Sequence, residues 1–372
     1  MIACPYCGRQ NETPAAHCGE CGTALPAPAE PPPPLPAPRL INLQALASAF
    51  SFEDGFHRVD WDFVCNWIES ELNAPDWEAA WNEAALHWVA KLRDDIGGNY
   101  AVHQSRQTIL LCEQPAETAR WLLDYAGRAA TTIRDQLGRT AWQGAVGKDV
   151  ALVFSDQDDY YQYVACHMAE GENPRSGGMC IGGGYTHIAL PWTDQFDVAN
   201  AIIHELAHDC VAHLTLPLWL NEGVAVTLER AIGAPPRPLG QSNQDALYGA
   251  SIGWRPPIMW DELTERHFTF WNEENIQTFW AGTSFYLPGD SNELSYSLAE
   301  VFVKLLTERG KGEAFRSFLE ASRPDDAGQS AVIDVLGADL GEIAGTFLGE
   351  GDWRPQRKAI KECWEAASWN NN

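Results

Sequence analysis

The spacing of apolar residues predicts a chain that begins and ends helical and has strands between. Over residues 40–95 the pattern is helical, and Trp77, Trp81 and Trp88 fall on one helical face. We expect these side chains to pack in a core rather than to form a ligand cage. The stretch TILLCE, residues 108–113, predicts a strand.

Beyond that strand the periodicity changes several times before it becomes helical. Residues 115–138 have the pattern of a long amphipathic helix. The stretch VALVF, residues 151–155, has the pattern of a buried strand. A short helix is expected to begin at 160–165, and 177–191 to form a strand loosened by glycine. From residue 195 the pattern is almost wholly helical, and no internal repeat is visible. These elements indicate the α+β class, with a small sheet followed by a helical lobe.

Length and charge exclude several classes of protein. The 372 residues suffice for two or three domains, and the net charge of −26 argues against binding to nucleic acid or an anionic membrane. No apolar run approaches the length of a membrane-spanning helix, and the first residues lack the basic and apolar regions of a signal peptide. We therefore expect a cytoplasmic protein without a membrane segment.

Four of the ten cysteines are paired at the start of the chain. Two C-x2-C turns, CPYCG and CGECG, aim four thiolates at one point, as a structural zinc ion requires. A redox pair or an iron site is the alternative, and His17 is expected to be a bystander. The expected ligands are Cys4, Cys7, Cys18 and Cys21.

This cysteine pattern resembles the short zinc ribbons that precede many bacterial proteins, and a proline-rich stretch follows it. Residues 26–39 should form an extended spacer, although a ligand for an SH3-like domain is the alternative. The spacer would leave the ribbon free to bind a protein partner. The expected organisation is a ribbon over 1–25, a linker over 26–39, a Trp-rich helical segment over 40–95 and a larger domain over 96–365.

The most informative motif is HELAH, residues 204–208. At positions i and i+4, His204 and His208 project from one helical face and can bind one metal ion. Glu205 lies next to this face, where it can reach a water molecule without being a ligand. Asp194 or Asp197 is expected to cap the helix.

A catalytic zinc site needs a third protein ligand and an open position. Glu222 is the best candidate, because one tight turn and a second helix would return it to the histidines; Asp209 and His213 are its rivals. Glu229 lies two turns further along this face and could orient His204. A solvent-exposed charge is the alternative for Glu229.

HELAH, the later LWLNEGVA and the trailing Glu229 resemble the gluzincin metallopeptidases, including the aminopeptidase N family and bacterial peptidase MA-like domains. The resemblance implies a thermolysin-like catalytic domain, with a small mixed sheet and a helical lobe. It also implies that His204, His208 and Glu222 bind a catalytic zinc ion and that Glu205 activates water.

The same resemblance suggests an oxyanion donor and a substrate cleft. In these families a tyrosine on a downstream helix precedes a small residue, which matches Tyr296 here. Tyr286 and His267 are its rivals, and simple packing at a helix start is the alternative. The resemblance also suggests that an edge strand binds the substrate backbone. The residues expected to line that cleft are Gly183, Gly184 and Tyr185. The alternative for these residues is a plain glycine-rich turn.

Two features depart from the aminopeptidase N family. The loop between the second histidine and the glutamate is shorter, which favours the MA-like branch, and the GxMEN motif that anchors a substrate amine is absent. We therefore expect a zinc peptidase with one catalytic and one structural zinc ion, acting on a peptide or protein. The alternative is an inactive peptidase-like scaffold whose ribbon is a protein-interaction module.

Overall fold

A computed structural model describes most of the chain from residue 41 onward. The described residues are 2–3, 10–11, 41–42, 44–141, 147–168, 177–233 and 260–369. At the N-terminus β1 (Ile2–Ala3) pairs antiparallel with β2 (Gln10–Asn11). The four ribbon cysteines, Cys4, Cys7, Cys18 and Cys21, and the linker over 26–39 lie outside the described residues.

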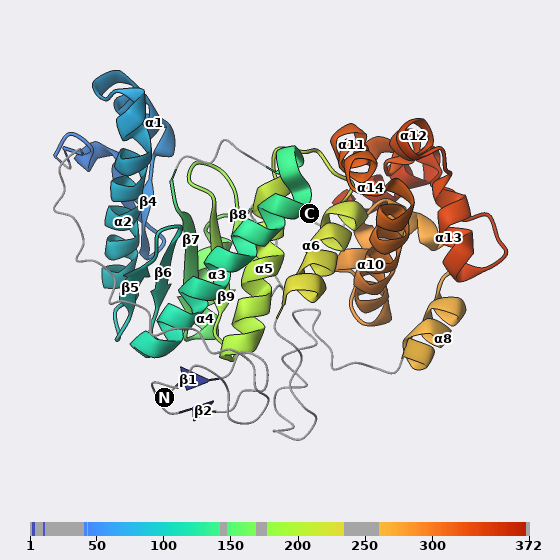
Figure 1. Cartoon of the computed structure of the whole chain (residues 1–372), viewed down its shortest axis with the longest axis horizontal. Helices are drawn as coiled ribbons and strands as arrows, with labels where there is room; N and C mark the ends of the chain where they lie inside the picture. Colours follow the sequence, from blue (N-terminus) through green and yellow to red (C-terminus); the bar gives the residue numbers. More distant parts are fainter. Residues whose placement is uncertain are drawn as a thin grey trace.

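A five-stranded mixed sheet lies at the centre of the N-terminal half (Figure 1). The three inner strands are parallel to one another, and each edge strand runs antiparallel to its neighbour. In spatial order the strands are β5 (Ala101–Gln104), β6 (Thr108–Cys112), β7 (Asp149–Phe154), β9 (His187–Pro191) and β8 (Met179–Ile181). The expectation of an α+β protein with a small mixed sheet is confirmed.

Helices cover both faces of this sheet, because the buried strands are apolar on both sides. Along β6, Leu110 contributes to one hydrophobic cluster, whereas its neighbours Ile109 and Leu111 contribute to the other. The first face is covered by α3 (Ala116–Leu137) and α5 (Gln195–Val211). The second face is covered by α1 (Trp61–Glu71), α2 (Trp77–Ile96) and α4 (Gln157–Ala165).

The C-terminal half is a lobe of helices that continues the hydrophobic cluster of the first face (Figure 1). Its central contact is between α6 and α10, where Gly223 allows the two helices to approach closely. The described helices of the lobe are α6 (Leu218–Ile232), α8 (Trp260–Phe270), α9 (Ile276–Trp280), α10 (Asp290–Gly310), α11 (Glu313–Ala321), α12 (Gln329–Ala331), α13 (Leu340–Leu348) and α14 (Arg357–Trp369).

The Trp-rich segment is a core element, as its pattern predicts. Trp61 stacks on Trp81 with ring centroids 5.8 Å apart and meets Trp88 edge to face at 5.5 Å. The expectation that 40–95 is helical throughout is wrong, because β3 (Phe50–Glu53) and β4 (Phe56–Val59) form a hairpin.

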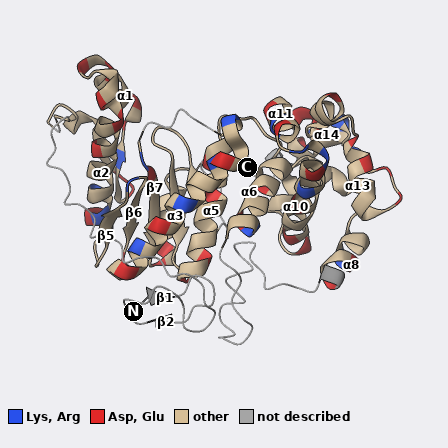
Figure 2. Cartoon of the chain, viewed as in Figure 1, with Lys and Arg blue, Asp and Glu red and all other residues tan. Residues whose placement is uncertain are grey.

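Basic and acidic residues are mixed along the described helices. Figure 2 shows basic positions scattered among acidic ones along the described helices. Within the part of the chain that the structure describes, no helix is both long enough and apolar enough to cross a membrane.

Candidate metal centre

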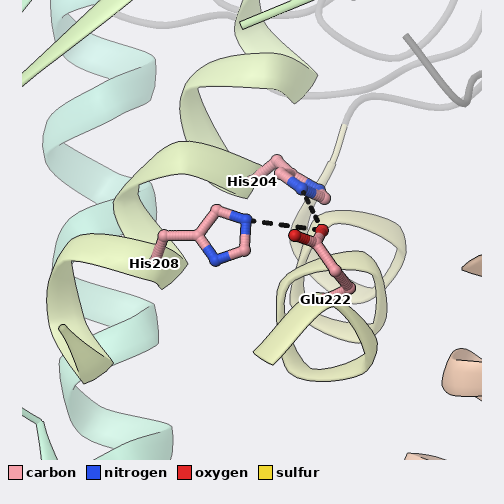
Figure 3. Close-up of side chains that lie close together, drawn as sticks. All are labelled: His204, His208 and Glu222. Carbon is pink, nitrogen blue, oxygen red and sulfur yellow. Dashed lines mark ion pairs between the residues drawn. The ribbon is translucent and has the colours of Figure 1, made fainter. Parts of the chain in front are cut away.

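Helix α5 holds the two histidines of the HELAH motif. Its first turn is capped by Asp194, whose carboxylate accepts hydrogen bonds from the backbone N–H groups of Phe196 at 2.7 Å and Asp197 at 3.2 Å. The buried residues of α5 pack on the sheet and on α3. His204 and His208, one turn apart, therefore project together from the face turned toward α6 (Figure 3).

Helix α6 begins after Pro217 and returns Glu222 to this pair. The Glu222 Oε2 atom lies 3.3 Å from His204 Nε2 and 3.5 Å from His208 Nε2 (Figure 3). One ligand atom from each of the three residues lies within 4.8 Å of the others, and no other such group of three is found among the described residues. The third ligand expected from the sequence thus lies beside the histidines.

Two ligand-to-ligand distances in this cluster match those around a tetrahedral zinc ion. With zinc–ligand bonds of about 2.0–2.1 Å, two ligand atoms lie roughly 3.3 Å apart, which is close to both measured distances. The buried Glu222 Oε2 atom has no hydrogen-bond partner within the described residues. An acceptor left in this condition is costly unless a cation or proton satisfies it.

The two rivals of Glu222 lie elsewhere. His213 is exposed in the turn after α5. Burial and, to a smaller extent, the charge of Asp149 raise the pKa of Asp209 to about 6 against the opposing effect of Arg134. Neither residue belongs to the group that could hold a metal ion.

The three candidate ligands strongly perturb each other's protonation. Burial lowers the pKa of His204, but the carboxylates of Glu222 and Glu229 outweigh it and hold this pKa well above its usual value. For His208, burial also lowers the pKa, and Glu222 again reverses the direction. Burial raises the pKa of Glu222, yet the two histidines hold it well below its ordinary value. Without a metal ion the cluster therefore retains protons, and metal binding must displace them.

Glu229 orients one of the two histidines. Its Oε2 atom lies 3.0 Å from His204 Nδ1, on the side of the ring opposite the cluster. This contact leaves Nε2 of His204 as the nitrogen that faces Glu222, as a metal ligand requires. The corresponding His208 Nδ1 atom is buried and has no partner among the residues described.

Glu205 points from α5 toward the edge of the sheet. It is 7% exposed, and its carboxylate accepts a hydrogen bond from the backbone N–H of Cys180 on β8. Burial raises its pKa, and the charge of Glu222 adds to this, while His208, His204 and the Cys180 hydrogen bond oppose it. A carboxylate with a raised pKa beside a metal site is suited to accept and return a proton.

The charges of this cluster act on Tyr296 of α10. Burial raises its pKa well above the usual value, and the charges of Glu222 and Glu205 raise it further. Its ring meets Phe285 edge to face at 5.1 Å. The hydroxyl therefore stays protonated and can act as a hydrogen-bond donor.

The two rivals of Tyr296 have different surroundings. His267 is fully buried, and its Nδ1 accepts a hydrogen bond from Trp271 at 3.0 Å, while Nε2 lies 3.0 Å from the Ser297 hydroxyl. Both ring nitrogens of His267 are therefore already engaged in hydrogen-bond contacts. Tyr286 is 80% exposed at the end of a short helical turn, residues 283–286.

The residues expected to line the substrate cleft lie on the face of the sheet opposite the candidate metal centre. The Tyr185 ring lies 5.1 Å from that of Trp61, and its hydroxyl donates to the Lys148 carbonyl at 2.6 Å. Gly184 also abuts Trp61, and Gly183 lies in the same region. All three belong to the turn between β8 and β9, which faces the Trp-rich segment.

Strand β8 provides the edge near the candidate metal centre instead. A Cβ atom at Gly178 would lie 3.0 Å from Glu205 Oε1, and the Cys180 backbone contacts the same carboxylate. Sequence reasoning missed these residues because it treated 177–191 as one strand. The glycine triplet 182–184 was the available signal for a turn.

Comparisons with known proteins do not assign the chain to a family: no family model matches it, and no curated protein matches it. The chemistry of the site is therefore inferred from its own side chains.

Proposed function

We propose that this protein is a zinc-dependent peptidase of the gluzincin type. The observation that carries the proposal is the approach of Glu222 Oε2 to the Nε2 atoms of His204 and His208, at 3.3 and 3.5 Å. Two imidazoles and one carboxylate from consecutive helices form a ligand set typical of catalytic zinc. Three protein ligands would leave a fourth position for water or substrate.

A zinc ion held by these three residues would supply a Lewis acid that polarises a carbonyl and lowers the pKa of water. The protein's contribution is the arrangement around it. Glu222 and His208 are part of the partly buried cluster, and Glu229 contacts the far side of the His204 ring, at Nδ1. These contacts reduce the side-chain reorganisation that metal binding would require.

Glu205 acts as the general base in this proposal. It takes a proton from the attacking water and later delivers it to the leaving amine. Its burial and its hydrogen bond from Cys180 hold the carboxylate in one orientation toward the edge strand. A peptide lying along β8 would therefore meet the base directly.

Tyr296 is the proposed oxyanion donor. Its hydroxyl stays protonated beside the carboxylates, so it can donate a hydrogen bond to the oxygen that becomes negative during attack. One such donor typically contributes about 3–4 kcal/mol to stabilising the transition state.

The four N-terminal cysteines complete the proposal with a structural zinc ion, held by Cys4, Cys7, Cys18 and Cys21. Such a segment is too short to fold without its metal. The ribbon would serve as a tethered module for a protein partner, while a peptide or protein is the substrate of the catalytic domain.

The Glu205→Gln variant tests the mechanism. We expect it to retain two zinc ions per chain by elemental analysis while turnover of quenched peptides or casein is lost, because only the proton acceptor is removed. Glu117→Gln on the exposed first turn of α3 is the matched control and should keep full activity. Turnover of Glu205→Gln at the wild-type rate would falsify the proposed role of Glu205.

The metal assignment is tested separately with His204→Ala. This variant should bind one zinc ion rather than two, because the ribbon cysteines are untouched. If it still binds two zinc ions, the histidine pair is not the metal site.

A further inference from the structure

A cavity of about 190 Å³ lies on the face of the sheet opposite the candidate metal centre. It is lined by strand β4 of the hairpin, the start of α1, the middle of α2, the end of α4 and the residues after it, the turn between β8 and β9, and the start of β9. Its walls come from segments far apart in the sequence, so the cavity is a product of the fold rather than of one loop. Nothing in the proposed peptidase mechanism uses it.

Aromatic side chains form much of the cavity wall. Phe56, Trp61, Trp88 and Tyr163 all line it, and these rings are buried in the second hydrophobic cluster. Cavities of about 150 Å³ with apolar walls can bind benzene. The space available here therefore fits one six-membered ring with a small substituent.

Arg58 supplies a positive charge in this aromatic wall. One of its terminal nitrogens, Nη2, donates to Asp54 at 2.8 Å, and Glu53 lies 3.9 Å from Nε, but both carboxylates are well exposed. The buried Nε atom has no hydrogen-bond partner among the described residues. No Asp or Glu is among the described residues that line the cavity.

The other polar groups of the wall are neutral or already paired. His187 Nδ1 donates to the Tyr185 carbonyl at 3.0 Å, so its Nε2 accepts from the Tyr163 hydroxyl at 2.7 Å. Burial lowers the pKa of His187 to about 3, which keeps this ring uncharged. The Cys166 thiol donates to the Gln162 carbonyl at 3.1 Å.

Two more imidazoles border the cavity. Desolvation, followed by the charge of Arg58, lowers the pKa of His167 to about 4. His57 Nδ1 is engaged by the Asp95 carboxylate at 2.7 Å. Among the described residues that line the cavity, the buried Nε atom of Arg58 is the buried side-chain polar atom that lacks a hydrogen-bond partner.

We propose that this cavity binds a small aromatic carboxylate, with the ring among the four aromatic side chains and the carboxylate at Arg58. The aromatic wall and the volume select a single planar ring, and the partnerless Nε–H selects an anion. Because the chain has a net charge of −26, the overall charge would not attract an anion. The attraction would come from the guanidinium of Arg58 in the cavity wall. The proposal does not depend on the peptidase function.

Benzoate is the probe for the first experiment, titrated into the full-length protein by calorimetry and by ligand-observed NMR. We expect binding with one site per chain. Benzamide has the same ring without the charge, and cyclohexanecarboxylate has the charge without the planar ring. Each should bind at least about tenfold more weakly, since each loses one of the two recognition elements. Equal binding of benzoate and benzamide, or no benzoate binding at all, would overturn the proposal.

Variants of Arg58 connect the binding to the cavity. Arg58→Gln should weaken benzoate binding at least about tenfold, and Arg58→Lys should recover part of it by restoring the charge. Arg93→Gln is the matched control, because Arg93 is paired with the neighbouring Asp94 outside the cavity, and it should bind benzoate like the wild type.

A thermal melt of each variant shows whether it is folded. If folded Arg58→Gln binds benzoate as tightly as the wild type does, the ligand lies elsewhere. The same conclusion follows if Arg93→Gln loses binding to the same extent as Arg58→Gln.

Discussion

Single histidines show how surroundings decide the chemistry of one residue type in this chain. His204 lies between two carboxylates, which hold its pKa well above the usual value against the effect of burial. His187 and His267 are more deeply buried and form no ion pair with a carboxylate among the described residues, and burial lowers the pKa of each. The sequence predicts the role of His204 through its spacing from His208. It contains no comparable signal for the two packing histidines.

The neutral state of His187 predicts a loss of stability in acid. Its folded-state pKa of about 3 lies below its usual 6.5, so the unfolded chain takes up a proton first as the pH falls. The stabilisation is fully present above pH 6.5 and is lost between that pH and about 3. His187→Gln retains a donor and an acceptor but does not titrate.

Urea unfolding at several pH values measures this effect. Between pH 6 and 4 the free energy of unfolding of the wild type should fall more steeply than that of His187→Gln, by about 1.4 kcal/mol per pH unit. Parallel pH profiles for the two proteins would show that His187 does not stay neutral in the folded state.

At the scale of elements, the contact between α6 and α10 sets the distance between Glu222 and Tyr296. Gly223 follows Glu222 directly, and a Cβ atom there would lie 2.7 Å from the carbonyl oxygen of Ala299. The buried carboxylate of Glu300 on α10 also pairs with Arg230 on α6. Close packing and this ion pair together fix the two helices side by side.

The Gly223→Ala substitution tests this contact. The added methyl group meets backbone, which cannot turn aside, so we expect a loss of about 1–3 kcal/mol in the free energy of unfolding. Gly182→Ala is the control, because a Cβ atom at Gly182 meets nothing within 4 Å. Denaturant unfolding of both variants measures the difference. Equal stabilities would mean that α6 and α10 can separate freely.

The elements differ in how well local sequence predicts them. Helix α5 follows directly from its apolar pattern and the Asp194 cap. The hairpin of β3 and β4 was missed, although Asp54 and Gly55 are a strong hairpin signal and both have the positive φ that a two-residue turn requires. Trp61 and its neighbours dominated the helical pattern of that region.

Residue spacing alone does not predict which residues far apart in the chain meet at the site. Glu222 is separated from His208 by one turn, so its return was predictable. Tyr296 was assigned only through family resemblance, because α10 follows α6 after a long stretch of chain. The approach of Cys180 to Glu205 depends on the strand order, which places β8 at the edge.

At the scale of the whole molecule, the sheet separates two hydrophobic clusters that are both needed to bury it. The cluster on the second face combines residues of the Trp-rich segment, such as Ile68 and Trp88, with strand residues such as Leu111 and Leu152. Residues 40–95 therefore provide much of the cover for the second face of the sheet.

Removal of residues 1–95 should prevent cooperative folding, because the apolar side chains on the second face would be exposed to water. We expect the shortened protein to bind a hydrophobic dye and to lack a sharp thermal transition. A protein lacking only residues 1–40 is the control and should melt cooperatively, since both clusters begin at or after Ile41. A cooperative melt of the chain without 1–95 would contradict this prediction.

The histidine pair and its carboxylate partner are attached to different halves of the molecule. Helix α5 rests on the sheet, whereas α6 begins the C-terminal lobe. A metal ion bound by residues of both helices would link the two halves. Metal binding would then also stabilise the folded arrangement of the halves, because the ion binds only when both helices are in place.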